Sequence, residues 1–245
     1  MNFKDRGIIL SKKFLQDNKY IVTIFTEKHG LYSGVVNKSS KKEGSVLSEG
    51  NLVDFLWNAR LHEHIGYAKI EPIKAFGAHI ITSKTKLYAF NSIVSLLKIS
   101  FCEREPHNNL FPHLLDFMES LKGNFCLERY VIFELSLLAE TGHELQLDRC
   151  AATNSSSNLF YVSPKSGRAV CKEAGDKFAN KLLLLPQFLI TDSHITCEQL
   201  NQAYLLTSYF IDRYILFGRD APKAREIFYN YMINIYKENT SLGSN

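Results

Sequence analysis

The sequence predicts an α+β protein, in which an N-terminal β-barrel is followed by an all-helical C-terminal domain with a small loop-and-hairpin excursion. Two observations predict this division. Up to about residue 80, short runs of β-branched and aromatic residues alternate with turn sequences, as half-buried strands require. Beyond that point, apolar residues recur every three or four positions, which is the spacing of amphipathic helices. The predicted domains are therefore 1–80 and 81–240, followed by a flexible tail at 241–245.

Five strands are expected in the first domain. In chain order they are Gly7–Phe14, Tyr20–Thr26, Leu31–Asn37, Leu52–Ala59 and Gly66–Phe76. The second and third form a hairpin, because Gly30 between them is free to take a positive φ. Pro72 indicates an edge position or a bulge in the last strand, since proline cannot donate to a ladder. Five short strands favour a small barrel of the OB type, and an SH3-like barrel stays open as an alternative.

Helices follow from the periodicity of the second domain. The periodic segments are Leu87–Phe101, Leu110–Leu121, Leu127–Ala139, Leu200–Tyr214 and Ile227–Tyr236. The segment 127–139 is apolar on nearly all sides, which is typical of a buried central helix. Thr196 and Gln199 have capping-box spacing before the fourth helix. The helical period disappears between residues 146 and 175, where a loop and a small hairpin are expected.

Charge is unevenly distributed along the chain. Residues 1–80 hold 12 Lys/Arg against 8 Asp/Glu, whereas the rest of the chain holds 17 of each. If a polyanion binds, the first domain is therefore the place to look for its site. The five cysteines are odd in number and scattered, which favours a reducing compartment. No apolar run approaches the roughly 20 residues of a membrane span, so a cytoplasmic protein is expected.

The motifs of common enzyme classes are absent from the sequence. We find no GxxxxGK[ST], GxGxxG, GxSxG or HExxH pattern. Carboxylates on the expected helices are interpreted as solvated charges, namely Asp116, Glu119, Glu134 and Glu140. The sequence therefore predicts neither catalysis nor a cofactor.

The first domain carries basic and aromatic residues that suit a nucleic acid. The candidate phosphate contacts are Lys12, Lys13, Lys38, Lys41, Lys42 and Arg60. Lysines neutralise phosphates without reading bases, and aromatic rings stack on unpaired bases. The candidate stacking residues are Phe14, Tyr20, Tyr32 and Trp57. The alternative interpretation is a solvated lysine loop that only keeps the protein soluble.

Cys150 and Cys171 are candidate metal ligands with an incomplete pattern. A structural zinc site closes a tetrahedron with four ligands, commonly two CxxC pairs. The positions three residues further on are Thr153 and Ala174, and neither is a plausible ligand. The sequence therefore favours a metal-free loop, with Cys150 and Cys171 as degenerate zinc positions.

Four segments together resemble one family. They are GIILSKKF, DNKYIVTIFTEKHGLYSGVVNKSSKK, FELSLLAETGHELQLDRC and RYILFGRDAPKAREIF. They are similar to the start, middle and end of the recombination mediator family RecO, in the family's order. The resemblance implies an OB-fold domain, a helical domain, and a small excursion that carries zinc in some members.

Residue roles are also implied by this resemblance. Lys38, Lys41 and Lys42 match the family's basic loop, although the loop is thinner in arginine than is usual. Arg219, Lys223 and Arg225 match the basic residues before its last helix. These three are candidates for contact with DNA or with a partner tail; the rival interpretation is that they cap the preceding helix. Thr153 and Ala174 depart from the zinc pattern, so the metal is not carried over.

The function implied by the resemblance is DNA repair without catalysis. Family members bind single- and double-stranded DNA, anneal complementary strands, and help RecA to displace single-strand-binding protein. The implied partners are RecR, in part of the family RecF, and the acidic tail of single-strand-binding protein. A nucleoid-associated location follows. An OB-fold RNA-binding protein is the alternative, and a hydrolase without a familiar motif is a third possibility.

Overall fold

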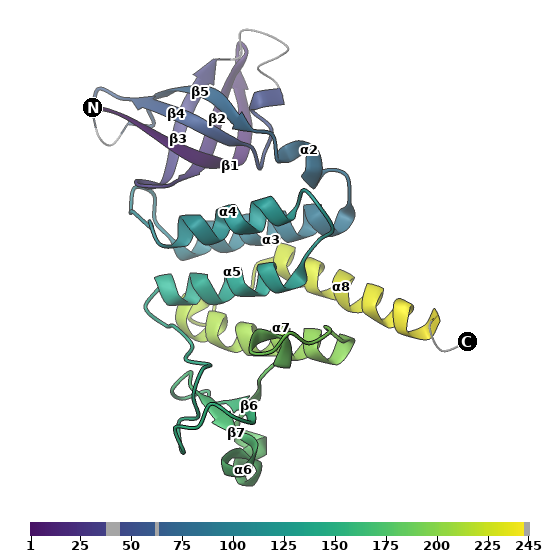
Figure 1. The fold of residues 1–245 in the computed structure, drawn as a ribbon. Helices are drawn as coiled ribbons and strands as arrows, with labels where there is room; N and C mark the ends of the chain where they lie inside the picture. Colours follow the sequence, from purple (N-terminus) through teal and green to yellow (C-terminus); the bar gives the residue numbers. More distant parts are fainter. Residues whose placement is uncertain (38–44, 62–63, 243–245) are drawn as a thin grey trace. The chain divides into compact units, whose positions relative to one another are not determined.

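The computed structural model describes residues 1–37, 45–61 and 64–242 of the chain (Figure 1). These residues form two compact units, Met1–Phe125 and Cys126–Asn245. The first unit contains the barrel and three helices that follow it in the chain. The second unit contains the remaining helices and a small sheet.

The first unit is built on a closed five-stranded barrel. Its strands are β1 (Asn2–Gln16), β2 (Lys19–Thr26), β3 (Gly30–Asn37), β4 (Leu52–Asn58) and β5 (Tyr67–Lys74). Their order around the barrel is β1-β2-β3-β5-β4. All neighbours are antiparallel except β3 and β5, which are parallel. This is the arrangement of a Greek-key OB barrel, so the predicted fold class is confirmed.

Strand β1 is longer than expected and closes the barrel. Its first half pairs with β4, from Asn2↔Asn58 to Ile8↔Leu52, and its second half pairs with β2. The sequence NFKDR before Gly7 is polar, so its composition does not predict a strand. A strand with one solvent-exposed face can nevertheless carry charged residues on that face. The bulge expected at Pro72 is present, because the β4–β5 register shifts at this point.

Two layers of apolar side chains stabilise the first unit. The barrel interior is filled by residues such as Val22, Ile24, Phe55 and Trp57. Outside the barrel, the buried ring of Phe25 lies 6.4 Å from the rings of Phe101 and Phe111, measured between centroids. After the barrel strands, this unit continues with the helices α2 (Gly77–Ile80), α3 (Lys84–Ser100) and α4 (Leu110–Ser120).

Helices dominate the second unit. They are α5 (Leu127–Glu140), α7 (Cys197–Ile211), the π-helical turn η3 (Asp212–Leu216) and α8 (Lys223–Leu242). The expected N-cap is present, because the Thr196 side chain accepts a hydrogen bond from the Gln199 main-chain N–H. After α5, Gly142 takes a φ of 83°, and His143 N–H donates to the Leu138 carbonyl. This is a Schellman termination, for which glycine is favoured.

The expected hairpin lies in the second unit as well. Strands β6 (Leu159–Val162) and β7 (Ala169–Cys171) form it, and β8 (Leu183–Leu184) adds a third strand in the order β7-β6-β8. The short helices are α6 (Lys172–Gly175), η1 (Asp176–Lys181) and η2 (Gln187–Leu189). The excursion therefore extends beyond residue 175. At the C-terminus α8 continues to Leu242, further than expected.

No helix among the described residues is long and apolar enough to cross a bilayer.

Candidate nucleic-acid interface

The β1–β2 hairpin positions the first group of candidate cations. Asp17 and Asn18 form its tip with φ angles of 46° and 62°. Two consecutive positive φ angles are typical of a type I′ turn, which Asp and Asn tolerate better than most residues. The turn brings Gln16 opposite Lys19 and Phe14 opposite Tyr20. Lys13 and Lys19 thereby lie on the two paired strands of one hairpin.

Lys12 and Lys13 project from opposite faces of β1. Lys12 pairs with Val22, whose side chain is buried inside the barrel, and Lys13 pairs with Ile21 on the outside. Directly opposed residues share a face of the sheet, and successive residues alternate. The candidate lysines of the hairpin therefore do not form a single patch. Lys12 lies on the interior side, where its main-chain N–H donates to the Glu49 carboxylate at 3.1 Å.

The outer face carries a continuous row of residues across four strands. Lys13 pairs with Ile21, Ile21 pairs with Val35, and Val35 pairs with Tyr67 of β5. We call this row the outer strip. It covers three strand spacings, or about 14 Å. It crosses the β2–β3 face, where OB barrels bind oligonucleotides.

Two further lysines lie on the same outer face. Lys19 is one residue before Tyr20 on β2 and so points outward. The Lys98 ammonium, from α3, donates to the Ser11 hydroxyl at 2.9 Å. Ser11 is two residues before Lys13 on β1 and shares its face. We call Lys13, Lys19 and Lys98 the outer lysines.

The outer lysines differ from the paired cations of the barrel, Lys4, Arg6, Lys69 and Lys74, in having no carboxylate partner among the described residues. Within the described ranges, no ion pair involves any of the three. By contrast, Lys4 lies 2.8 Å from Asp54, which raises the pKa of Lys4 through a hydrogen bond and charge attraction. Glu103 is an acidic side chain beside this face, since it accepts a hydrogen bond from the Ser33 hydroxyl at 2.5 Å. The outer lysines thus give this face positive charge that is not neutralised by ion pairs among the described residues.

The strip ends in a pocket of about 500 Å³ beside the β4–β5 loop. Arg60 lines this pocket together with Val35, His64, Ile65 and Tyr67. The Tyr67 side chain is 61% exposed. Of the predicted phosphate contacts, Arg60 and Lys13 are therefore placed at the two ends of one surface. Lys38, Lys41 and Lys42 lie outside the described residues.

The prediction for two of the four aromatic residues is wrong. Tyr32 and Trp57 are 6% and 1% exposed and belong to the barrel core. The Trp57 indole N–H donates to the carbonyls of Ser33 and Ile65, so it has a structural role. Phe14 and Tyr20 do lie at the hairpin tip, in an edge-on pair with centroids 5.5 Å apart. They point to the interior side, away from the outer strip.

Sequence reasoning missed Lys19, Lys98 and Tyr67. Lys19 and Tyr67 are the first residues of β2 and β5. The predicted strands begin at Tyr20, one residue after Lys19, and at Gly66, one residue before Tyr67. Lys98 belongs to a helix that the sequence predicts from its apolar positions alone. Strand alternation beginning from the Asp17-Asn18 turn is the signal that places Lys19 on the face of Lys13.

Arg225 in the second unit is not a contact residue, and this correction has a clear physical reason. Its guanidinium is buried and lies 2.7 and 3.0 Å from the two carboxylate oxygens of Glu134. It also donates to Thr207 and Ser208. Although burial opposes its charge, the attraction of Glu134 raises the pKa of Arg225. A side chain that is 1% exposed cannot reach DNA or a partner.

The same arrangement corrects the interpretation of Glu134 as a solvated charge. Its side chain is fully buried and accepts hydrogen bonds from the hydroxyls of Tyr130 and Tyr229. Burial, followed by the charge of Glu134, raises the pKa of Tyr229 well above its ordinary value. Glu119, another of the predicted solvated carboxylates, is paired with Lys74 and Lys122.

Arg219 and Lys223 differ in their surroundings. Arg219 donates to the carbonyls of Ile215 and Leu216 at the end of η3. This geometry matches the rival interpretation, in which the arginine caps the preceding helix. Lys223 is exposed in the first turn of α8. Of these two basic residues, only Lys223 projects without such a local hydrogen bond among the described residues.

Cys150 and Cys171 lie together but do not fit zinc. Their sulfur atoms are 3.4 Å apart, and the Thr153 hydroxyl lies 3.7 Å from the Cys171 sulfur. Ala174 has no donor atom and a threonine hydroxyl is not a usual zinc ligand, so these four positions supply only two of the four ligands of a tetrahedral site. Burial opposes ionisation of Cys150, yet hydrogen bonds from the Cys171 main-chain N–H and from Thr153 lower its pKa to about 6.

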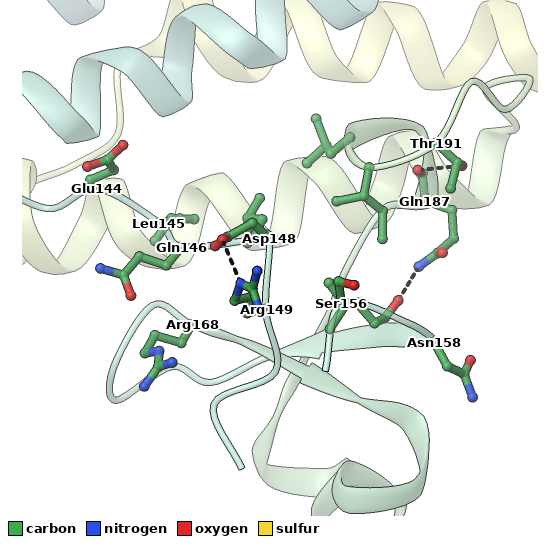
Figure 2. Close-up of a pocket in the computed structure, with 14 residues that line it drawn as sticks. Glu144, Leu145, Gln146, Asp148, Arg149, Ser156, Asn158, Arg168, Gln187 and Thr191 are labelled. Carbon is green, nitrogen blue, oxygen red and sulfur yellow. Dashed lines mark hydrogen bonds and ion pairs between the residues drawn. The ribbon is translucent and has the colours of Figure 1, made fainter. Parts of the chain in front are cut away.

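A second, larger pocket lies between the excursion and η2 of the second unit. It measures about 910 Å³ and is shown in Figure 2. Its charged lining is mixed, with Glu144 and Asp148 beside Arg149 and Arg168. The Arg149 Nε atom lies 3.8 Å from the Asp148 Oδ2 atom. Across residues 1–37, 45–61 and 64–242, no cluster of three or more His, Cys, Asp and Glu side chains is arranged to hold a metal.

The fold and the outer strip define an OB-barrel protein with a cationic outer face and an attached helical unit. Comparison with known families agrees with this class. The model for the recombination protein O N-terminal domain matches residues 1–76, and that for its C-terminal domain matches residues 82–220. The chain belongs to the RecO family of DNA repair proteins.

Individual relatives support this assignment over nearly the whole chain. The chain is 52% identical to DNA repair protein RecO of Rickettsia felis over 235 residues, which are 96% of this chain and 99% of the relative. The RecO protein of Rickettsia akari has the same identity and coverage. The RecO protein of Rickettsia bellii is 50% identical over 95% of this chain and 97% of the relative.

Proposed function

We propose that this protein acts in DNA repair as a recombination mediator, holding DNA on the outer strip without cleaving or modifying it. One observation carries the proposal: the outer lysines have no carboxylate partner within the described residues, and they lie on the face that OB barrels use for oligonucleotides. A phosphate backbone suits such a surface, because its negative charges can pair with these lysines.

Strand annealing follows from the same electrostatics. Two complementary strands repel each other, and a cationic face lowers this repulsion for both. Lysine ammonium groups act as point charges and read no base edges, so sequence preference should be weak. If Lys13, Lys19, Lys98 and Arg60 each meet a phosphate, log K should fall against log salt with a slope of about −3 for single strands.

The protein partners of the family are part of the proposal. We infer that the chain helps RecA to displace single-strand-binding protein and that it acts with RecR and, where present, RecF. For the acidic tail of single-strand-binding protein, Lys223 is the exposed residue of the predicted group whose side chain is not already donating to main-chain carbonyls, as Arg219 does. A cytoplasmic, nucleoid-associated location follows from this role.

Charge reversal of the outer lysines tests the proposal. The variant K13E/K19E/K98E should lose binding to single- and double-stranded DNA by at least about 100-fold at low salt, because three phosphate contacts become repulsive. Annealing of complementary oligonucleotides should fall with it. The measurement is fluorescence anisotropy across a salt series, together with an annealing assay.

A matched control separates location from net charge. The variant K165E/K177E/K181E changes three exposed lysines of the second unit and alters net charge equally. It should bind DNA within a few-fold of wild type. Equal loss in both variants, or wild-type binding by K13E/K19E/K98E, would contradict a site on the strip.

RNA binding is the second candidate function, because lysine ammonium groups bind the phosphates of RNA and DNA alike. Competition between RNA and DNA of equal length at one salt concentration decides between them. Tighter binding of RNA would favour this alternative.

A further inference from the structure

We propose that the pocket at the end of the outer strip receives one unpaired nucleobase of single-stranded DNA, stacked on Tyr67. This inference rests on the proposed function and adds to it a specific subsite and a reason to prefer single strands. It concerns the pocket of about 500 Å³ beside the β4–β5 loop.

The lining of the pocket suits an aromatic ring. Val35, Ala59 and Ile65 supply apolar surface, and the Tyr67 side chain presents a ring that is 61% exposed. An exposed tyrosine offers a stacking face to any base at little cost in side-chain entropy. The volume falls within the range of roughly 300–1,000 Å³ that is typical of small-molecule sites. The pocket therefore has the size and the chemistry for a base.

The floor of the pocket is held rigidly by the barrel. The Val35 main-chain N–H donates to the Gly66 carbonyl at 2.9 Å, and the Trp57 indole donates to the Ile65 carbonyl at 2.9 Å. Gly66 itself has a φ of 69°, and a Cβ there would come within 2.6 Å of the Trp57 ring. The backbone can approach the indole this closely only at glycine.

A second anchor comes from the segment that follows α3. Arg104 donates to the His64 carbonyl at 3.0 Å, and its guanidinium lies 5.8 Å from the Trp57 ring centroid. Its main-chain N–H donates to the Leu31 carbonyl on β3 at 2.8 Å. These hydrogen bonds tie the described wall of the pocket to the barrel strands. Preorganisation of this kind reduces the ordering cost of binding.

Charge on either side sets the path of the strand. Arg60 lines the pocket itself, and Lys13 lies at the other end of the outer strip, about 14 Å away along the sheet. OB folds typically cover about 4–16 nucleotides, so both cations fall within one footprint. The strand would place its phosphates on these cations and one base in the pocket beside Arg60.

The geometry distinguishes single strands from duplexes. A base inside a duplex is stacked and paired, and it must be extruded at a cost before it can enter a pocket. An unpaired strand has no such cost. The lysines therefore attract both forms, whereas the pocket favours single strands.

The variant Tyr67→Ala tests the subsite. It should weaken binding of single-stranded oligonucleotides by roughly 5- to 150-fold, which corresponds to the loss of one base–aromatic stack. Duplex binding and the salt slope should stay at wild-type values, because no charge is removed. Tyr67→Phe should bind as wild type does. An oligonucleotide carrying one 2-aminopurine should show fluorescence quenching on binding that Tyr67→Ala abolishes.

The control is Phe178→Ala, which removes another exposed aromatic ring, 56% exposed, from the second unit. It should leave single-strand affinity unchanged. Wild-type affinity for single strands in Tyr67→Ala, while K13E/K19E/K98E still abolishes binding, would overturn the base pocket and leave the proposed function intact. If the wild-type protein bound no DNA at low salt, the proposed function would fail, and the base pocket with it.

Discussion

Lys13 in the barrel unit and Arg225 in the helical unit lie in opposite surroundings. Lys13 is exposed on the outer strip and has no carboxylate partner among the residues that the structure describes. Arg225 is buried and is bonded to both carboxylate oxygens of Glu134. The first cation is available to a ligand, whereas the second is committed to its own unit. The difference teaches that a count of basic residues does not locate a binding surface.

The largest effect is expected from breaking the buried pair. Arg225→Ala leaves the Glu134 carboxylate buried without its partner, which should lower the free energy of unfolding by about 3–5 kcal/mol. Urea unfolding followed by circular dichroism at 222 nm measures this loss. Lys223→Ala in the same helix is the control and should stay within about 0.5 kcal/mol of wild type. A loss below about 1 kcal/mol for Arg225→Ala would contradict the structural role given to this ion pair.

The buried Cys150 thiol of the helical unit should make the free energy of unfolding depend on pH. The pKa of Cys150 is lowered from 9.0 to about 6 in the folded protein. The thiolate therefore adds stability that is fully present above pH 9 and is lost as pH falls to 6. Compared with Cys150→Ala, the free energy of unfolding of wild type should rise over this range, by at most about 1.4 kcal/mol per pH unit. Parallel stability curves for the two proteins from pH 6 to 9 would refute this assignment.

The smallest effect distinguishes two lysines of the barrel itself. Lys13→Ala should reduce the magnitude of the salt slope for single strands by about 0.7, because one phosphate contact is lost. Lys4→Ala should leave the slope unchanged, since Lys4 is already paired with Asp54 at 2.8 Å. DNA titrations at four or more salt concentrations measure both slopes. An equal change in the two variants would mean that ion pairing on the barrel does not determine which lysines bind DNA.

Local patterns in the sequence predicted most of the fold. Strand alternation, the Pro72 bulge and the Thr196 cap are all properties of neighbouring residues, and each is present in the structure. The extent of β1 was underestimated, because its first residues are polar and are held by pairing with β4. That pairing joins segments about 50 residues apart, and no local pattern reports it.

The candidate site was less predictable for the same reason. Glu134 and Arg225 are 91 residues apart, so nothing near either one indicates a buried pair. Trp57 is of a residue type that stacks on bases, but strand alternation points its side chain into the barrel interior. Lys98 joins the outer lysines only because α3 passes Ser11. Residue type suggested the chemistry, and tertiary contacts decided which residues carry it.

The packing of Phe25 has a practical consequence for dissecting this protein. Its outward ring is fully covered, with the rings of Phe101, His107 and Phe111 beside it. Truncation near residue 80 would remove Phe101, His107 and Phe111. It would expose the Phe25 ring on the isolated barrel, and exposed apolar surface favours aggregation. A fragment intended for solution work should therefore run to Phe125, where the first compact unit ends.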